Sequence, residues 1–528
     1  MFSNQPKFDN RRRPEVRRGE CGMALLLVLL TLFLLSAIGL GMLYMSNTET
    51  VVNSNYRDTQ LAFFAMRGGL EEMRDRMRSN SISPIALPTA LPTPGAANSI
   101  VYITNRAGSS DTMVDPQTTT NAYADDEFCQ VHHFSGLPSG TPGVPCTVSP
   151  PAAGITYVSS VSPNTNTTAA LKYKWVRITL KQNGSVAGAK VDATQTDDKQ
   201  VCYQTALNQE IPVSLVGGGA YATCAAAQTA GLDASPVYLV VSMAVTPQGS
   251  RRIGQYEVAG LTFTPPGGAL GLDGPGATFS PRPSSSQYFI DGHDTGAAGY
   301  SASGGTGSCN PPAGLTVPAV STGDASGTTN VTTSITGNPN RSSNYTGTGA
   351  APSVVNSGPT GTGAYSGQWS SPSQLDALVS GLANIADVTY SCGIGAACSP
   401  AGTVGTNANP QITYADGDFN MGNASGAGVL VVTGTLSFSG NASFNGLILV
   451  IGQGIVSESG GGNGGFNGTV FVAKTRSATA PYAELATLGT PSYAWNGGGT
   501  SDIQYNSCWA NIGNGLHYNI VAMREEMY

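Results

Sequence analysis

Charged side chains are scarce in this 528-residue sequence, since Asp, Glu, Lys and Arg make up 11 % of it, less than half of the usual quarter. A helix-rich enzyme needs charged residues on its exposed helix faces, so the scarcity argues against that class. Classical disorder is a poor fit too, because 40 % of the chain is apolar. Glycine and proline are abundant instead, with 68 and 32 positions. The composition favours a strand- and loop-rich exported protein of two or three domains.

Recognisable catalytic motifs are missing as well. The sequence has no G-x-S-x-G, no Walker-type glycine loop and no H-E-x-x-H. We therefore expect no enzyme activity, no catalytic residue, no cofactor and no bound metal. The net charge of −7 argues against nucleic acid as a partner. The first 22 residues are the exception, because they hold six basic and three acidic residues, as a targeting signal does.

An uncharged apolar run follows this basic head and extends from Met23 to Met45. As a helix it would be about 34 Å long, enough to span a bilayer core of roughly 30 Å. The preceding arginines should remain in the cytoplasm, so the body is expected on the exported side. A cleavable secretory signal is the competing interpretation, but its apolar region would be only about 7–15 residues long.

The helical pattern continues without a breaker to Asn80, which predicts one helix over residues 23–80. Its second half carries one apolar stripe, with spacings of four, three and four residues. The stripe consists of Met66, Leu70, Met73 and Met77. Charged residues are spaced for i,i+3 and i,i+4 ion pairs, namely Glu71–Arg74, Glu72–Arg76 and Asp75–Arg78.

The junction before the apolar run, Arg17-Arg18-Gly19-Glu20-Cys21-Gly22-Met23, resembles the class III signal of type IV prepilins. The resemblance implies that a prepilin peptidase removes the leader 1–22 after Gly22 and methylates Met23. The stretch after the run is similar to PilX-type minor pilins in two places, Asn55-Tyr56-Arg57-Asp58 and Ala62-Phe63-Phe64-Ala65. The resemblance covers about residues 17–80.

Two positions depart from the major pilins. Those proteins usually begin with an aromatic residue and have glutamate fifth, where this chain has Met23 and Leu27. In the family the glutamate neutralises a neighbouring subunit's N-terminal amine inside the apolar fibre, where an unpaired charge is costly. Its absence implies a minor or tip subunit whose partners are the peptidase, other major and minor pilins and the inner membrane. Pseudopilins that cap secretion-system filaments lack the glutamate too, and they remain the alternative.

The sequence after the helix divides into three zones, and together with the helix they predict an α+β protein. Residues 100–265 are β-rich, and the resemblance implies a pilin-like layer packed on the helix; an unrelated β-sandwich on a stalk is the alternative. Residues 266–370 are rich in Gly, Ser, Thr and Pro and have no fixed period, which predicts a loop zone. Residues 371–528 begin with a short amphipathic helix from Leu375 to Ile385, with Ser371 or Ser373 as its N-cap.

The last zone holds the clearest internal repeat, within residues 411–473. Apolar tetrapeptides recur at 429–432, 447–450 and 470–473, and Phe-Asn-Gly recurs at 444–446 and 466–468. Short strands at a near-constant period, separated by Gly/Asn corners, are typical of stacked parallel strands. We predict a short parallel β-solenoid-like stack of three to four rungs, with a β-meander as the alternative.

Two groups of polar residues are candidate sites of a different kind. Asp291, His293 and Asp294 could hold a metal, although a strand ending in an Asp-Gly turn explains them better. Asp416 and Asp418 would share a strand face and could act as a pair of carboxylates on a glycan, although a solvated corner is the simpler explanation. They support a third function, a membrane-anchored solenoid that binds or cleaves carbohydrate.

Eight cysteines remain after loss of the leader, and an oxidising exported compartment permits them to pair. Eight cysteines allow 105 pairings, of which we favour the three local ones. The local pairs are Cys129–Cys146, Cys202–Cys224 and Cys392–Cys398, which leaves Cys309–Cys508.

These features together favour a minor type IV pilin that acts in pilus assembly at the fibre tip. It would display a β-rich adhesive head with a surface or glycan ligand. We expect a single span of the inner membrane with a cytoplasmic N-terminus and an exported C-terminus, and later a place in the pilus.

Overall fold

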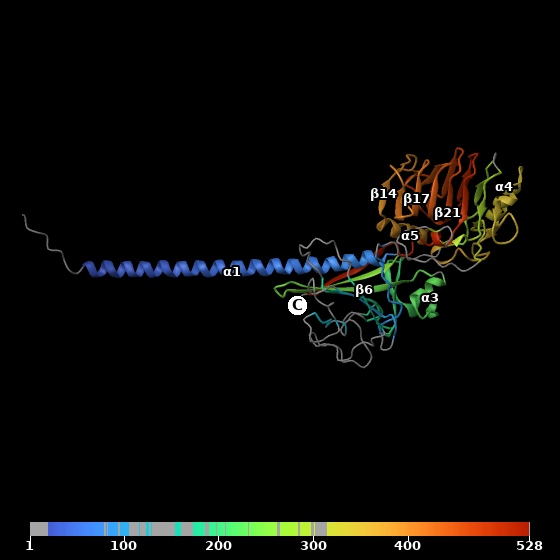
Figure 1. Cartoon of the computed structure of the whole chain (residues 1–528). Helices are drawn as coiled ribbons and strands as arrows, with labels where there is room; N and C mark the ends of the chain where they lie inside the picture. The colour runs from blue at the N-terminus through green and yellow to red at the C-terminus, as the bar shows by residue number, and fades with distance from the viewer. Residues whose placement is uncertain are drawn as a thin grey trace, which may run out of the picture.

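The structure is a computed structural model of the chain. It describes residues 20–78, 81, 83–92, 96–104, 116, 123–125, 128, 154–159, 173–184, 190–196, 198–205, 207–230, 232–260, 265–282, 286–296, 300 and 314–526. One long helix projects from a β-rich body, and the body consists of a sheet beside the helix and a separate stack of strands (Figure 1). This agrees with the expected α+β class.

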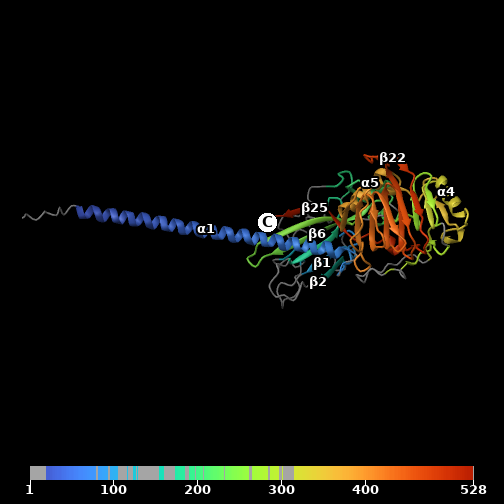
Figure 2. The same ribbon diagram turned by 90° about the horizontal axis from the view of Figure 1, so that it is seen from above.

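The helix α1 runs from Glu20 to Met77 without interruption, because no proline occurs between Pro14 and Pro84. Its first half stands free of the body, and its second half lies along the sheet (Figures 1 and 2). The predicted stripe Met66, Leu70, Met73 and Met77 is buried there against the sheet, which confirms that part of the sequence interpretation.

The sheet beside α1 has eight strands, of which β6 and β7 form the hairpin at its centre. All its strand pairs are antiparallel except β1 with β2. The apolar side chains of one face, such as Val176, Val240 and Val258, pack on the helix. The strands are β1 (Ile100–Thr104), β2 (Ile155–Ser159), β3 (Trp175–Leu180), β4 (Val201–Gln204), β5 (Gln209–Pro212), β6 (Ser235–Val245), β7 (Arg251–Gly260) and β25 (Tyr518–Glu526). The 3-10 segment η2 (Val213–Gly219) and α3 (Cys224–Thr229) cover one end of it.

The expected C-terminal domain boundary is wrong, because the last strand, β25, belongs to the sheet beside α1. Residues 371–528 were predicted to form one C-terminal domain, but β25 returns to the first sheet and pairs with β7 from Gly260↔Tyr518 to Ile253↔Glu526. The whole strand stack is therefore inserted between two neighbouring strands of the sheet. The sequence gives no sign of this, since the strand partners are more than 250 residues apart.

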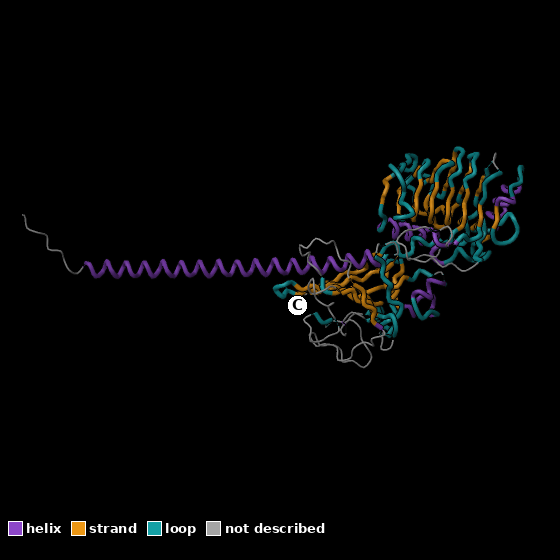
Figure 3. The backbone as a smooth tube through the Cα atoms, in the orientation of Figure 1, coloured by secondary structure: helices purple, strands orange, loops and turns teal. Residues whose placement is uncertain are grey.

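The strands of the inserted stack form two sheets of twelve and five strands, and all their pairs are parallel except β21 with β22 (Figure 3). From β15 to β21 the chain alternates between the two sheets. The repeat predicted from the sequence is in register, because Phe444-Asn445-Gly446 pairs with Phe466-Asn467-Gly468. The glycines Gly428, Gly446 and Gly468 stack on one another with φ of 124–149°. Residues with a side chain rarely adopt that backbone conformation, so these glycines allow each long strand to bend at the same level.

The bend divides the twelve-stranded sheet into two faces. Before Gly468, β21 pairs with β24, and after it the same strand pairs with β8. With the five-stranded sheet, the stack thus has three strand faces around one apolar core. The strands of the later half are β14 (Val388–Ser391), β15 (Gln411–Asp416), β16 (Phe419–Asn420), β17 (Ser425–Val432), β18 (Thr435–Ser439), β19 (Ser443–Gly452), β20 (Ile455–Ser459), β21 (Gly465–Arg476), β22 (Glu484–Gly489), β23 (Ser492–Trp495) and β24 (Asp502–Tyr505).

The predicted loop zone 266–370 is the largest error of the sequence interpretation. It supplies strands that continue the stack beyond β21, because β8 pairs with β21 and β11 pairs with β8. Each strand is only two to four residues long, too short to show a period in the sequence. They are β8 (Leu270–Asp273), β9 (Thr278–Ser280), β10 (Ile290–Asp291), β11 (Val320–Thr322), β12 (Tyr345–Thr346) and β13 (Val354–Asn356), with α4 (Ala325–Thr336), η4 (Ser342–Asn344) and η5 (Gly367–Trp369) beside them.

One face of the stack is covered by α5 (Pro372–Asn384), the short helix expected from the sequence. Its N-cap is Ser371, whose Oγ accepts a hydrogen bond from the backbone N–H of Gln374 at 3.4 Å. Leu375, Leu378 and Leu382 pack on the sheet together with Trp509 from α6 (Ser507–Ala510). The twelve-stranded sheet therefore has apolar side chains on both of its faces, one set in the core of the stack and the other under α5.

Because the stack is inserted between β7 and β25, we expect the eight-stranded sheet and α1 to fold without it. Replacing residues 261–517 by an Asn-Gly turn would join β7 to β25 as a tight hairpin, because their ends already pair at Gly260↔Tyr518. We expect the shortened chain to keep its protected amides in β6 and β7, measured by hydrogen exchange in detergent. A matched variant that also removes β7 (residues 251–517) should lose that protection. Loss in both would show that the sheet depends on the stack.

Candidate functional site: an apolar helix joined to an inserted strand stack

The free half of α1 is the most unusual surface of the molecule. Its large apolar side chains are 47–78 % exposed from Met23 to Met45, with no charged residue among them. An exposed apolar surface of this size marks contact with a membrane or with other proteins. The helix is long and apolar enough to cross a membrane. Leu27 lies on this surface and is 63 % exposed.

The Gly22–Met23 bond lies near the start of α1, two residues after Glu20. The rest of the predicted leader and the side chains before Met23 are outside the described residues. Cleavage and methylation at this bond therefore stay predictions from the sequence.

The charged residues in the other half of α1 form ion pairs within the helix and hydrogen bonds to the body. The three ion pairs expected from the spacing are present, with N–O distances of 2.9 Å for Arg74–Glu71, 3.3 Å for Arg76–Glu72 and 2.9 Å for Arg78–Asp75. The acidic partners also accept hydrogen bonds from the sheet, from the Tyr256 hydroxyl to Glu71 at 3.1 Å and from the Tyr173 hydroxyl to Glu72 at 2.8 Å. These bonds set the rotation of the helix on the sheet.

A polar cleft of about 410 Å³ lies where α1, the stack and β25 meet. His517 Nε2 and Asp387 Oδ2 are 3.0 Å apart on its wall, and Arg78 lines it from the helix. Burial raises the pKa of Asp387, but hydrogen bonds from His517 and from the Ile412 N–H outweigh it and hold the pKa below its usual value. Asp387 is therefore an ionised group that ties the stack to the residue preceding β25.

Cysteine pairing follows the spacing where it is described. Disulfides join Cys202 to Cys224 and Cys392 to Cys398. Cys508 is disulfide-bonded as well, and its partner is not among the described residues. The expected pair Cys129–Cys146 and the position of Cys309 also lie outside the described residues.

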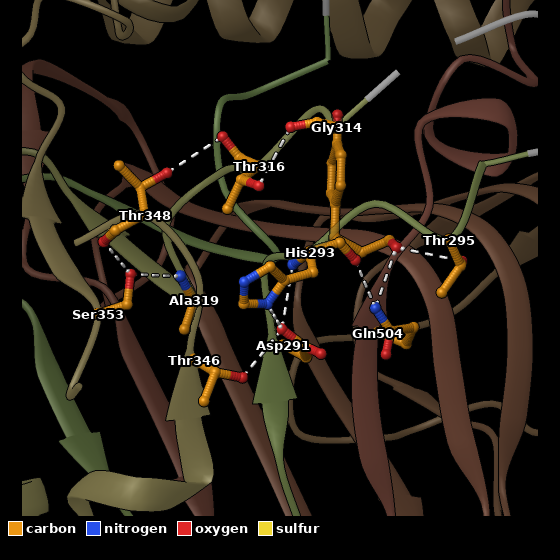
Figure 4. A network of polar contacts seen from close by, with 11 residues as sticks. Asp291, His293, Thr295, Gly314, Thr316, Ala319, Thr346, Thr348, Ser353 and Gln504 are labelled. Carbon is orange, nitrogen blue, oxygen red and sulfur yellow. Dashed lines mark hydrogen bonds and ion pairs between the residues drawn. The ribbon is translucent and has the colours of Figure 1, made fainter. Parts of the chain in front are cut away.

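Asp291, His293 and Asp294, the residues considered as possible metal ligands, do not converge. Asp291 Oδ1 lies 2.6 Å from His293 Nδ1 and accepts a hydrogen bond from the Thr346 hydroxyl at 2.9 Å (Figure 4). Asp294 turns away and binds the backbone N–H and hydroxyl of Ser507 at 2.8 and 2.6 Å. In the described part of the chain, no three His, Cys, Asp or Glu residues could hold a metal ion together.

Asp416 and Asp418 do not form the pair considered from the sequence. Asp416 ends β15 and Asp418 precedes β16, with Gly417 at a φ of 116° between them. Asp418 accepts hydrogen bonds from the N–H groups of Thr435 and Gly395, each at 2.7 Å. These bonds satisfy backbone donors at a corner of the stack. The geometry thus favours the structural role of Asp418.

Sequence reasoning missed a row of polar side chains on the face of the stack that precedes the stacked glycines. Asn445, Asn467, Gln504, Asp291 and Thr346 are in register on neighbouring strands and point away from the core. The Phe-Asn-Gly repeat already contained the first two members, but it indicated corners only. The other members come from strands whose order in space differs from their order in the chain.

Comparison with known protein families, with curated proteins and with solved structures finds no match for this chain.

The two described disulfides should differ in their effect on stability. Cys202–Cys224 spans 22 residues and Cys392–Cys398 spans six, so by loop-closure entropy they stabilise the folded state by about 3 and about 2 kcal/mol. We expect the Cys202→Ala/Cys224→Ala variant to lose more free energy of opening than the Cys392→Ala/Cys398→Ala variant. Native-state hydrogen exchange of the amides beside each disulfide measures both. An equal or reversed order would contradict the loop-closure account.

Proposed function

We propose that the chain is a prepilin-like, membrane-anchored subunit, a PilX-type minor pilin that carries a β-solenoid head. The observation that carries the proposal is the division of α1 into two halves. The half up to Met45 exposes its apolar side chains, and the half from Ala62 buries its stripe against an antiparallel sheet. A helix of this kind can lie in the inner membrane before assembly and among the helices of other pilins afterwards.

The inserted stack supports the second part of the proposal, a displayed head. Its parallel strands, stacked bends and single core are the features expected of a short β-solenoid. It is joined to the sheet at the end opposite the free half of α1 (Figure 1). In a fibre whose core is formed by the helices, the stack would thus face outward.

The proposed partners follow from the resemblance of residues 17–80. They are a prepilin peptidase, other major and minor pilins, and the inner membrane, with the N-terminus in the cytoplasm and the body exported. A tip subunit of a secretion-system filament would have the same helix and the same leader. Finding the chain in sheared surface fibres, and not in a secretion-system filament, would decide for the pilus.

Processing tests the proposal directly. Gly22→Leu should leave the leader on the chain, because the resemblance places the cut after this glycine. Gly39→Leu is a matched control, since a Cβ at this position meets no atom within 4 Å and the position lies well inside the apolar helix. Intact-mass analysis should find a mature start at Met23, N-methylated, in the wild type and the control. An unprocessed wild type in a strain with active prepilin peptidase would contradict the proposal.

Position in the fibre gives a second test, at Leu27. Without a carboxylate at this position the chain cannot neutralise a neighbour's buried amine, and an isolated buried charge costs several kcal/mol. We expect sparse incorporation of the wild type, with the head at the fibre tip in immunogold images. Leu27→Glu should raise the amount of this chain per sheared fibre, measured by mass spectrometry, whereas the uncharged Leu27→Gln should not. Wild-type heads spaced evenly along fibres would show that the missing carboxylate does not set position.

A further inference from the structure

The polar row on the stack consists of Asn445, Asn467, Gln504, Asp291 and Thr346 in spatial order. Each residue is directly opposite the next on a parallel neighbour, so the row crosses five strands with one side chain per strand, about 4.8 Å apart. The residues before or after them in each strand point into the core, as Phe466 and Ile503 do. The five side chains therefore lie half-buried on the outer face of the sheet at a fixed spacing, with Asn467 Oδ1 the most covered of their polar atoms.

Bonds within the protein orient two side chains of the row, Gln504 and Asn445, and the neighbouring His293. Gln504 donates from Nε2 to the carbonyl oxygen of His293 at 2.7 Å, and its Oε1 has no partner among the described residues (Figure 4). Asn445 donates from Nδ2 to Asn407 Oδ1 at 2.8 Å. The His293 side chain is 58 % exposed and is held by Asp291 through Nδ1, which leaves Nε2 toward solvent. The row thus combines acceptors and donors that are already oriented.

An exposed aromatic ring lies beside the row. Phe289 is 39 % exposed, and it is the one large aromatic side chain in the described part of the stack, residues 265–516, that is exposed to this degree. Its backbone N–H donates to Asp502 Oδ1 at 2.9 Å, and Asp502 is two residues before Gln504 on the same side of β24. The ring therefore stands next to the row, with no packing role in the core clusters.

The charges of this face select among possible ligands. The parts of the five strands that lie on this face, before the stacked glycines, contain no Lys or Arg, and the acidic residues there are Asp291 and Asp502. Burial raises the pKa of Asp502 to about 6, so this carboxylate is largely ionised at neutral pH. An anionic glycan or a nucleic acid would be repelled, whereas neutral hydroxyl groups can donate to the carboxylates and amides.

We propose that the polar row and Phe289 bind an extended neutral polysaccharide, a β-linked chain that runs along the stack and across its strands. Each strand offers one polar side chain, a spacing comparable to one sugar residue of an extended chain, and the Phe289 ring stacks on the apolar face of a sugar. This deepens the proposed function, because it gives the displayed head its ligand class.

The test uses the full chain, solubilised in detergent, in sedimentation assays with insoluble cellulose, a neutral β-1,4-glucan. We expect saturable binding that does not change between low and high salt, since no ion pair forms. Phe289→Ala should weaken binding by roughly fivefold to tenfold, and Gln504→Ala by several-fold. Ser437→Ala is the matched control, because this residue also points outward from a strand of the stack, but on the five-stranded sheet. It should bind as the wild type does.

Thermal unfolding of each variant, equal to that of the wild type, would show that the loss is local. Absence of wild-type binding to cellulose, stronger binding to the anionic glycan alginate, or unchanged binding by Phe289→Ala would each overturn the proposal. Association of two copies through this face, seen as a dimer that Phe289→Ala dissolves, would overturn it too. None of these assays needs a fibre, so failure here with normal processing at Gly22 would refute the ligand and leave the proposed function standing.

Discussion

Burial of one methionine-rich stripe of α1 on the antiparallel sheet is the contact on which the rest of the molecule depends. Met66, Leu70, Met73 and Met77 are at most 4 % exposed there, and each buried side chain of this size contributes about 1.5–3 kcal/mol. The same sheet supplies β7 and β25, between which the stack is inserted. Packing of the helix on the sheet thus stabilises the two strands to which the stack is attached. The free half of α1 receives no such support and is left to a membrane or to other helices.

The helix could be predicted from the sequence because its signals are local. An uncharged run, a stripe at helical spacing and three ion pairs all lie within 60 consecutive residues, and the structure places them as expected. The Phe-Asn-Gly repeat could also be recognised in the sequence, and its identical residues pair with each other on adjacent strands. The sequence also narrowed the N-cap of α5 to Ser371 or Ser373, and the structure shows that it is Ser371.

The rest could not be predicted, because it depends on contacts between distant parts of the chain. Arg282 lies in the zone expected to be loops, yet it forms a buried ion pair with Glu458 at 2.5 Å, 176 residues away. The guanidinium also lies 4.5 Å from the centre of the Trp495 ring. Nothing local links these residues. The polar row was missed for the same reason, because Asp291 and Gln504 become neighbours only when strands from the two ends of the inserted segment stack together.

The way the stack is attached also has a mechanical consequence. Both connections leave the sheet at the same end of its strands, from the end of β7 and the start of β25, which pair at Gly260↔Tyr518. A force that pulls the stack away from the sheet would therefore act on both strands along their length. The nine residue pairs between β6 and β7 would then be loaded simultaneously in shear, not opened one after another. The load would thus reach the sheet through two adjacent strands and not through a single strand end.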